Sequence, residues 1–204
     1  MFRLVGLLIG YFIGCISTAF IMMKIMKVDL RKHGSGNLGT TNALRVLGLK
    51  AGLTTLAGDI LKCVLAFFIL MQMYPEEGIL AGIYAALGTI IGHNFPFYLN
   101  FKGGKGIASS LGMLLSLGIF FSPWLVIVPA GIGLSVVAKT KYISAGSITG
   151  AILLPLTAFA LHMPTEEFLI ILFLGVLAVY RHKENIGRLR SGTENKLSVH
   201  KKAK

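Results

Sequence analysis

The feature that most constrains this chain is a succession of long apolar stretches, which fill it from residue 4 to residue 180 with only short polar segments between them. Hydrophobic residues make up 54% of the 204 residues and the mean hydropathy is +0.76, an average that soluble domains do not sustain. A backbone in lipid must satisfy its own hydrogen bonds, so long apolar stretches of this kind form helices. The sequence therefore predicts an all-α integral membrane protein built as one domain.

The apolar stretches divide into seven predicted spans. The stretch 107–138 could form one helix or two, and we divide it at Ser122-Pro123. Two helices there, instead of one, put Lys139 and Lys141 on the same side as the other basic segments. The predicted spans are residues 4–26, 53–71, 78–98, 107–121, 123–138, 143–161 and 168–180. In the first of them Gly6, Gly10 and Gly14 recur every fourth residue, which predicts close helix packing.

The charges orient these spans. Of the 20 Lys and Arg residues, all but Arg3 and Lys62 fall on one side, and the two acidic turns fall on the other. The positive-inside rule then predicts that the N-terminus is outside and the C-terminus cytoplasmic. The net charge of +12 is spread between apolar spans, so it fits an anionic membrane face or anionic substrates better than nucleic acid. This orientation puts the polar segments after spans one, three and seven on the cytoplasmic face.

The polar segment GHNFPFYLNFKGGKG, residues 92–106, combines lysines with side-chain-free residues ahead of an apolar stretch. Glycine lets backbone N–H groups approach a ligand closely, and the N-terminus of a following helix favours an anion. This predicts a phosphate-binding loop at a membrane surface. The alternative is a flexible basic loop that only obeys the positive-inside rule.

The polar segment HGSGNLGTTNALRVLGLK, residues 33–50, is rich in hydrogen-bond donors and predicts a short helix over residues 41–47. It formally matches GxGxxG, but the dinucleotide-binding interpretation needs a preceding strand and a βαβ unit, and the chain offers neither. The third segment, RHKENIGRLRSGTENKL at 181–197, contains an acid, Glu194, among cations. This segment is either a tail that binds lipid headgroups or part of a functional site. For Glu194 we favour the simpler role of an ion-pair partner for one of the neighbouring cations.

Asp59 and Lys62 lie three residues apart within the second span. Ionisable groups at membrane depth are costly and usually pair, so they either lock helices together or form a charged floor beneath an anion site.

Several chemistries are excluded by the sequence. The histidines of the cytoplasmic segments are not followed by Asp five residues later, the glycine-lysine loop does not have the Walker A spacing, and no carboxylates cluster to hold Mg²⁺. Cys15 and Cys63 have no metal-ligand spacing. We therefore expect no metal and no cofactor. A site rich in cations and donors but poor in bases is suited to stabilising anions.

Three segments, GSGNLGTTNALRVLG, GHNFPFYLNFKGGKGIA and ENIGRLRSGTENK, on a seven-span chain resemble the bacterial acyl-phosphate:glycerol-3-phosphate 1-acyltransferase family. The resemblance covers nearly the whole chain; only the final residues 198–204 carry no family feature. It implies transfer of a fatty acyl group from acyl phosphate to the 1-hydroxyl of glycerol 3-phosphate, giving lysophosphatidic acid and phosphate in the bacterial inner membrane, with membrane lipids as the other partners and neither acyl-CoA nor acyl-carrier protein as donor.

The resemblance also implies roles for individual residues. The expected catalytic residues are Ser35, Arg45, Lys105, His182 and Asn185. The expected substrate-binding residues are Asn37, Thr41, Asn42, Lys102, Gly103, Gly104, Gly106 and Arg188. The expected structural or pocket-floor residues are Asp59, Lys62, His93 and Glu194. We expect Lys105, Arg45 and backbone N–H groups to hold the phosphates, and the three segments to converge on one cytoplasmic site.

Two alternatives belong to other classes. A transporter of phosphorylated anions would share the basic segments, but the chain has no inverted repeat and its polar groups gather on one face. A lipid-binding scaffold would need the cations but not the glycine loops.

Overall fold

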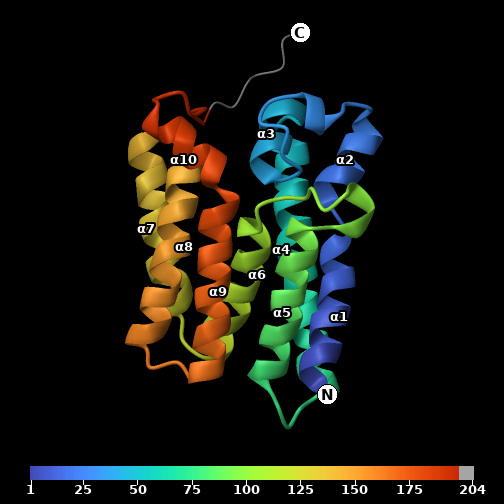
Figure 1. The fold of residues 1–204 in the computed structure, drawn as a ribbon, viewed down its shortest axis with the longest axis vertical. Coiled ribbons are helices and arrows are strands. Elements are labelled where there is room, and N and C mark those ends of the chain that lie inside the picture. The colour runs from blue at the N-terminus through green and yellow to red at the C-terminus, as the bar shows by residue number, and fades with distance from the viewer. Residues whose placement is uncertain (198–204) are drawn as a thin grey trace. The chain divides into compact units, whose positions relative to one another are not determined.

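The computed structural model describes residues 1–197, and every regular element in that range is helical (Figure 1). The all-α prediction is confirmed. Four helical segments in this range are long and apolar enough to cross a membrane: Phe2–Met26, Leu49–Met73, Ile79–Leu99 and Ile143–Ala160. Two shorter apolar helices are Ile107–Phe120 and Trp124–Thr140. The count of seven spans and their orientation stay predictions.

The described residues form two compact units, of which the first comprises residues 1–113. Its main helices are α1 (Phe2–Cys15), α2 (Thr18–Met26), α3 (Thr40–Leu47), α4 (Leu49–Met73) and α5 (Ile79–Asn94). Two short 3₁₀ turns, η1 (Leu30–Lys32) and η2 (Phe97–Leu99), lie in its loops. The helix predicted over residues 41–47 is α3, at the same end of the unit as α2 (Figure 1).

Helices α1 and α5 pack through glycines. A Cβ at Gly10 would collide with the Ala85 carbonyl, and one at Gly14 with the Thr89 carbonyl. From the other side, a Cβ at Gly92 would collide with the Tyr11 carbonyl. The four-residue glycine spacing therefore brings the two backbones into contact, which confirms the packing role predicted for it.

The first predicted span is not one helix. Helix α1 ends at Cys15 and α2 begins at Thr18, with Ile16 and Ser17 extended between them. The Ser17 hydroxyl accepts a hydrogen bond of 3.2 Å from the Phe20 N–H and so caps α2. No Gly or Pro forces this interruption, and its physical reason lies in the side chains that contact it, described below.

The second unit comprises residues 114–197. Helix α6 (Ile107–Phe120) begins in the first unit and ends in the second, which continues with α7 (Trp124–Thr140), α8 (Ile143–Ala160) and α9 (Thr165–Arg181). The chain breaks between α6 and α7 at Ser122-Pro123, where the sequence predicted a break. A short helix that the sequence analysis did not predict, α10 (Lys183–Arg190), follows α9 (Figure 1).

Candidate active site

The loop of the first motif is held together by one buried side chain, Asn42. Its Oδ1 accepts a hydrogen bond of 2.9 Å from the Ser35 N–H. Its Nδ2 donates to the carbonyl oxygens of Leu30 and His33, each at 3.1 Å. Asn42 is 1% exposed, so its amide is committed to the loop and is not presented to a ligand. In the structure Asn42 therefore holds Ser35 in place, and the substrate-binding role expected for it stays a prediction.

The same loop begins with an ion pair. Asp29 caps η1 by accepting from the Arg31 N–H at 3.0 Å, and its two carboxylate oxygens bind the Arg31 guanidinium at 2.9 and 2.8 Å. The Arg31 side chain and then its backbone N–H hold the pKa of the Asp29 carboxyl well below its usual range.

The other residues expected from the first motif surround this loop. Ser35 and Arg45 are half-buried, with Arg45 in the last turn of α3. The Asn37 amide lies against Gly39, and Thr41 is half-buried in the first turn of α3. The first motif thus contributes the Ser35 hydroxyl, from the loop that Asn42 holds, and the Arg45 guanidinium, from the last turn of α3.

The glycine loop differs from the expectation in its hydrogen bonding. The Gly103 N–H donates to the Asn94 carbonyl at 3.1 Å, and the Gly104 N–H donates to the His93 carbonyl at 3.0 Å. These two N–H groups are bonded within the protein, so they do not form the predicted phosphate cradle. Both glycines are needed for another reason: a Cβ at Gly103 would collide with the His93 carbonyl, and one at Gly104 with the His93 ring.

The end of this loop keeps the features that favour an anion. Gly106 has φ +83°, a conformation that favours glycine, and α6 starts directly after it. The first N–H groups of a helix have no preceding carbonyl in the helix and carry its positive end. Lys105 is half-buried beside them and Lys102 is exposed. Lys105, Gly106 and the start of α6 therefore keep the features expected of an anion site, and their binding role stays a prediction.

Beneath the loop lies a buried cluster of three ionisable side chains, Asp59, Lys62 and His93. The Lys62 ammonium lies 2.9 Å from Asp59 Oδ1 and 2.9 Å from His93 Nδ1. Asp59 Oδ1 also accepts from the Thr18 hydroxyl at 3.3 Å. The side chains of Lys62 and Asp59 are 7% and 1% exposed, so the two opposite charges compensate each other out of water.

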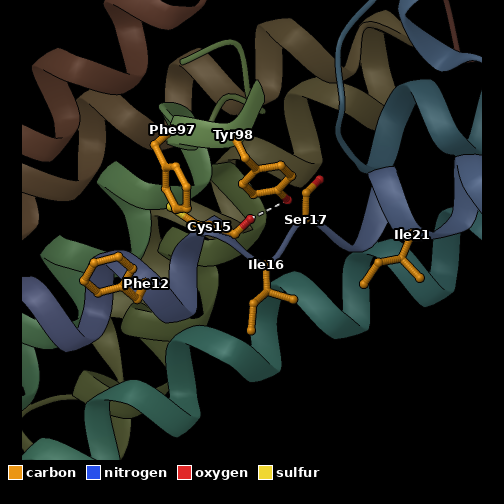
Figure 2. A pocket seen from close by; sticks show the side chains of 7 residues that line it. All are labelled: Phe12, Cys15, Ile16, Ser17, Ile21, Phe97 and Tyr98. Carbon is orange, nitrogen blue, oxygen red and sulfur yellow. Dashed lines mark hydrogen bonds between the residues drawn. The ribbon is translucent and has the colours of Figure 1, made fainter. Parts of the chain in front are cut away.

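The cluster explains the interruption between α1 and α2. Lys62 Nζ donates to the carbonyl oxygens of Gly14 at 3.1 Å and Ile16 at 2.9 Å. The Tyr98 hydroxyl donates to the carbonyl between them, that of Cys15, at 2.8 Å (Figure 2). A helix end inside a membrane protein needs such partners, and a cation suits it because it also compensates the negative end of the helix dipole.

An apolar cavity of about 390 Å³ opens beside this interruption. Figure 2 shows its lining, in which only Ser17 and the Tyr98 hydroxyl contribute side-chain oxygens. The lining residues are Phe12, Cys15, Ile16, Ser17, Ile21, Phe97 and Tyr98. Its chemistry suits an apolar chain.

In the second unit, the third motif forms its own hydrogen-bonded group. Glu194 accepts from Asn185 Nδ2 at 2.9 Å and from Arg188 Nε at 2.8 Å. Glu194 thus pairs with the cation of Arg188, as the structural role expected for it requires, and that role stays a prediction. His182 is buried, and its Nδ1 lies 2.7 Å from the Ala178 carbonyl. Because a carbonyl only accepts, Nδ1 carries the proton, and in the neutral ring Nε2 carries the lone pair.

The structure thus brings the glycine loop and the buried cluster together within the first unit, through His93, and orders the third motif within the second. The prediction that all three segments share one site stays a prediction. The structural roles of Tyr98 and Asn42 were not predicted from the sequence. For Tyr98 the one available signal was its position inside the second motif; for Asn42 there was none. Among residues 1–197, no group of three His, Cys, Asp or Glu side chains could hold a metal ion.

Comparisons with known proteins show the family of this chain. The family model described as glycerol-3-phosphate acyltransferase matches residues 4–192. A glycerol-3-phosphate acyltransferase of Alkaliphilus metalliredigens is 43% identical over 97% of this chain and 97% of its own length. One of Thermus thermophilus is 38% identical over 94% of this chain and 93% of its own length.

Two solved structures are also similar. One is the glycerol 3-phosphate form of PlsY (YgiH), an integral membrane glycerol 3-phosphate acyltransferase, with a TM-score of 0.87 and 32% identity over 96% of each chain. The other is the lysophosphatidic acid form, with a TM-score of 0.84 and 30% identity over 97% of this chain and 96% of that one.

Proposed function

The chain belongs to the glycerol-3-phosphate acyltransferase family, and from that premise we propose that its acyl donor is an acyl phosphate. The protein is an integral membrane enzyme that acylates glycerol 3-phosphate in phospholipid synthesis. The similarity over nearly the whole chain to the glycerol 3-phosphate form of a solved acyltransferase is the observation that carries this function. We assign the 1-hydroxyl as the acceptor, and lysophosphatidic acid and phosphate as the products.

The proposed donor fits the residues available. An acyl phosphate is a mixed anhydride, so its leaving group departs without strong general-base help. The hydroxyl oxygen forms an ester bond to the acyl carbon, the bond from that carbon to the phosphate oxygen breaks, and the leaving phosphate takes the hydroxyl proton. The residues then have to bind two phosphates, orient the hydroxyl and stabilise developing negative charge.

The cations supply that charge stabilisation in our proposal. Lys105, beside the start of α6, and Arg45, at the end of α3, bind substrate phosphates, and Lys102 and Arg188 are further substrate-binding cations. Ser35, held through its backbone by Asn42, donates its hydroxyl to a phosphate oxygen. These assignments require no metal ion and no cofactor.

His182 orients the acceptor hydroxyl. With its proton on Nδ1, the neutral ring presents an acceptor at Nε2, which suits a hydrogen bond from the 1-hydroxyl. If a phosphate oxygen is the final proton acceptor, as we propose, His182→Ala lowers the rate only a few-fold at saturating substrates. A loss of about 100-fold or more would instead identify His182 as the base.

One assay tests the function. Purified protein in detergent receives acyl phosphate and glycerol 3-phosphate, and phosphate release and lysophosphatidic acid are measured. Release that needs both substrates supports the proposal, and activity with acyl-CoA but not with acyl phosphate would contradict the donor. Uptake of glycerol 3-phosphate into vesicles without chemistry would favour the transporter.

We also propose that the protein lies in the bacterial inner membrane with seven spans and its site facing the cytoplasm. The excess of basic residues in the segments after spans one, three and seven supports this orientation. Cys15 and Cys63 are buried, so single cysteines introduced at Ser35, Lys102 and Arg190 can be labelled against a low background. Labelling of these positions from opposite faces of the membrane would overturn the topology.

A further inference from the structure

The imidazole of His93 lies between the buried ion pair and the glycine loop. It is 5% exposed, with Nδ1 at 2.9 Å from Lys62 Nζ and 3.6 Å from Asp59 Oδ1. The opposite edge of the ring faces the loop, because a Cβ at Gly104 would collide with Nε2 and would lie 2.7 Å from Cε1. The ring therefore lies between the glycine loop and the ion pair, for which the sequence suggested a charged floor beneath an anion site.

The partners of Lys62 determine which nitrogen of His93 carries the proton. An ammonium has three N–H donors and no acceptor. A proton on Nδ1 would point at those hydrogens across 2.9 Å, so the Nδ1 lone pair must face Lys62. The ionisable groups beside this nitrogen are Asp59 and Lys62, which compensate each other. The ring is then neutral, with its proton on Nε2, the nitrogen that faces the loop.

The loop is bonded to the same residue by its backbone. The Gly104 N–H donates to the His93 carbonyl at 3.0 Å, and the neighbouring Gly103 N–H donates to the Asn94 carbonyl at 3.1 Å. A displacement of the His93 ring would therefore move the segment that leads directly into Lys105 and Gly106.

We propose that His93 is a positioning residue for glycerol 3-phosphate binding. Its neutral ring, oriented by Lys62, packs its Nε2 edge against Gly104 and so holds Lys105 and the start of α6 in their binding arrangement. Asp59 and Lys62 act through this ring, which links the buried ion pair to the loop. The inference rests on the proposed function, in which this loop binds a substrate phosphate.

Two substitutions distinguish the contribution of the Nδ1 edge of the ring from that of the Nε2 edge. In His93→Gln the amide nitrogen can occupy the place of Nε2, so the contact with the loop is kept and the acceptor for Lys62 is lost. In His93→Asn the amide oxygen can occupy the place of Nδ1, so the acceptor for Lys62 is kept and nothing reaches the loop. In either variant Lys62 keeps the Gly14 and Ile16 carbonyls and the Asp59 carboxylate as partners, so its charge stays compensated.

The kinetic test uses the full chain in detergent, with both substrates varied. We expect His93→Asn to raise KM for glycerol 3-phosphate about tenfold or more while KM for acyl phosphate changes less than about threefold, and His93→Gln to keep KM for glycerol 3-phosphate within about threefold of wild type. The exposed His162 provides matched controls, His162→Gln and His162→Asn, which leave both constants unchanged. Equal effects of the two His93 substitutions on KM would overturn the proposal.

A spectroscopic test covers the case in which a variant unfolds. In protein labelled with ¹⁵N-histidine, the His93 signals, identified by their loss in His93→Gln or by a paramagnetic label, should show an unprotonated Nδ1 and a protonated Nε2. A protonated Nδ1 would overturn the inference even if wild-type protein makes lysophosphatidic acid. If wild type makes none, the proposed function fails, whatever the tautomer.

Discussion

The Lys62 ammonium lies 2.9 Å from the carbonyl oxygen of Ile16. A side chain of α4 therefore supplies a hydrogen bond to the backbone where the helix is interrupted between α1 and α2. The same ammonium pairs with Asp59 at 2.9 Å. One buried cation therefore compensates a carboxylate and satisfies backbone groups that a membrane interior could not hydrate. The ion pair predicted from sequence is thus also what allows the first helical segment to bend.

Replacement of Lys62 should be among the most destabilising substitutions in the first unit. Lys62→Met leaves the Asp59 charge buried without its partner, and we expect the free energy of unfolding to fall by about 3–5 kcal/mol. The double variant Asp59→Asn/Lys62→Met removes the uncompensated charge and should recover part of that loss. Unfolding in detergent measures both, and a double variant no more stable than Lys62→Met would contradict the explanation.

Asn42 offers an isosteric test of the first loop. In Asn42→Asp a carboxylate oxygen replaces the amide nitrogen and faces the carbonyls of Leu30 and His33, to which Nδ2 now donates. We expect the loop to open, with faster amide exchange at Ser35 and a loss of activity of about tenfold or more. Amide exchange at Ser35 that stays as slow as in wild type would show that Asn42 does not hold the loop.

The two interruptions of the apolar stretches show what the sequence could predict. The break at Ser122-Pro123 was predictable, because the basic residues beyond it indicate the side of the membrane and the proline favours a break there. The interruption at Ile16-Ser17 was not, because its cause is Lys62, 46 residues away along the chain. Local sequence therefore predicts a helix end well when neighbouring residues cause it, and poorly when a side chain distant in the chain stabilises it.

The candidate site shows the same limit at Gly103 and Gly104. Their spacing correctly indicated a loop with close backbone contacts, but not which atoms make them. The contacts are with His93 and Asn94, and both N–H groups are bonded to protein carbonyls. The third motif was easier to predict, because Arg188 and Glu194 are only six residues apart.

Substitution of Gly104 should disturb the loop through His93. In Gly104→Ala the added Cβ meets the His93 ring, which is fixed by Lys62 on its other edge. We expect KM for glycerol 3-phosphate to rise about tenfold or more. The matched control is Gly131→Ala, where a Cβ meets nothing within 4 Å and helix propensity improves by up to about 1 kcal/mol. An active, fully stable Gly104→Ala would contradict the contact.

The Asp29–Arg31 pair gives a pH-dependent prediction outside the apolar helices. Because the pKa of the Asp29 carboxyl is lowered in the folded state, its contribution to stability is complete above the unfolded pKa of about 3.9 and is lost as pH falls toward the folded value. The carboxyl ¹³C signal of Asp29 should therefore titrate below that of an unfolded reference. Arg31→Ala should raise the midpoint, and an unchanged midpoint would show that Arg31 is not the cause.

Substitutions of Glu194 can distinguish the contribution of its charge from that of its hydrogen-bond acceptor in the third motif. It accepts from Asn185 Nδ2 and pairs with Arg188, and its side chain is 5% exposed. Glu194→Gln can still accept from Asn185 but loses the charge facing Arg188, whereas Glu194→Ala loses both interactions. Since a hydrogen bond to a charged group contributes about 1.5–3 kcal/mol, we expect Glu194→Ala to be clearly less stable than Glu194→Gln.

Activity should follow the same order, because Asn185 is the proposed catalytic residue that Glu194 holds. Thermal unfolding and the initial rate of lysophosphatidic acid formation measure the two effects, and a Glu194→Ala variant with wild-type activity would contradict a supporting role for Glu194.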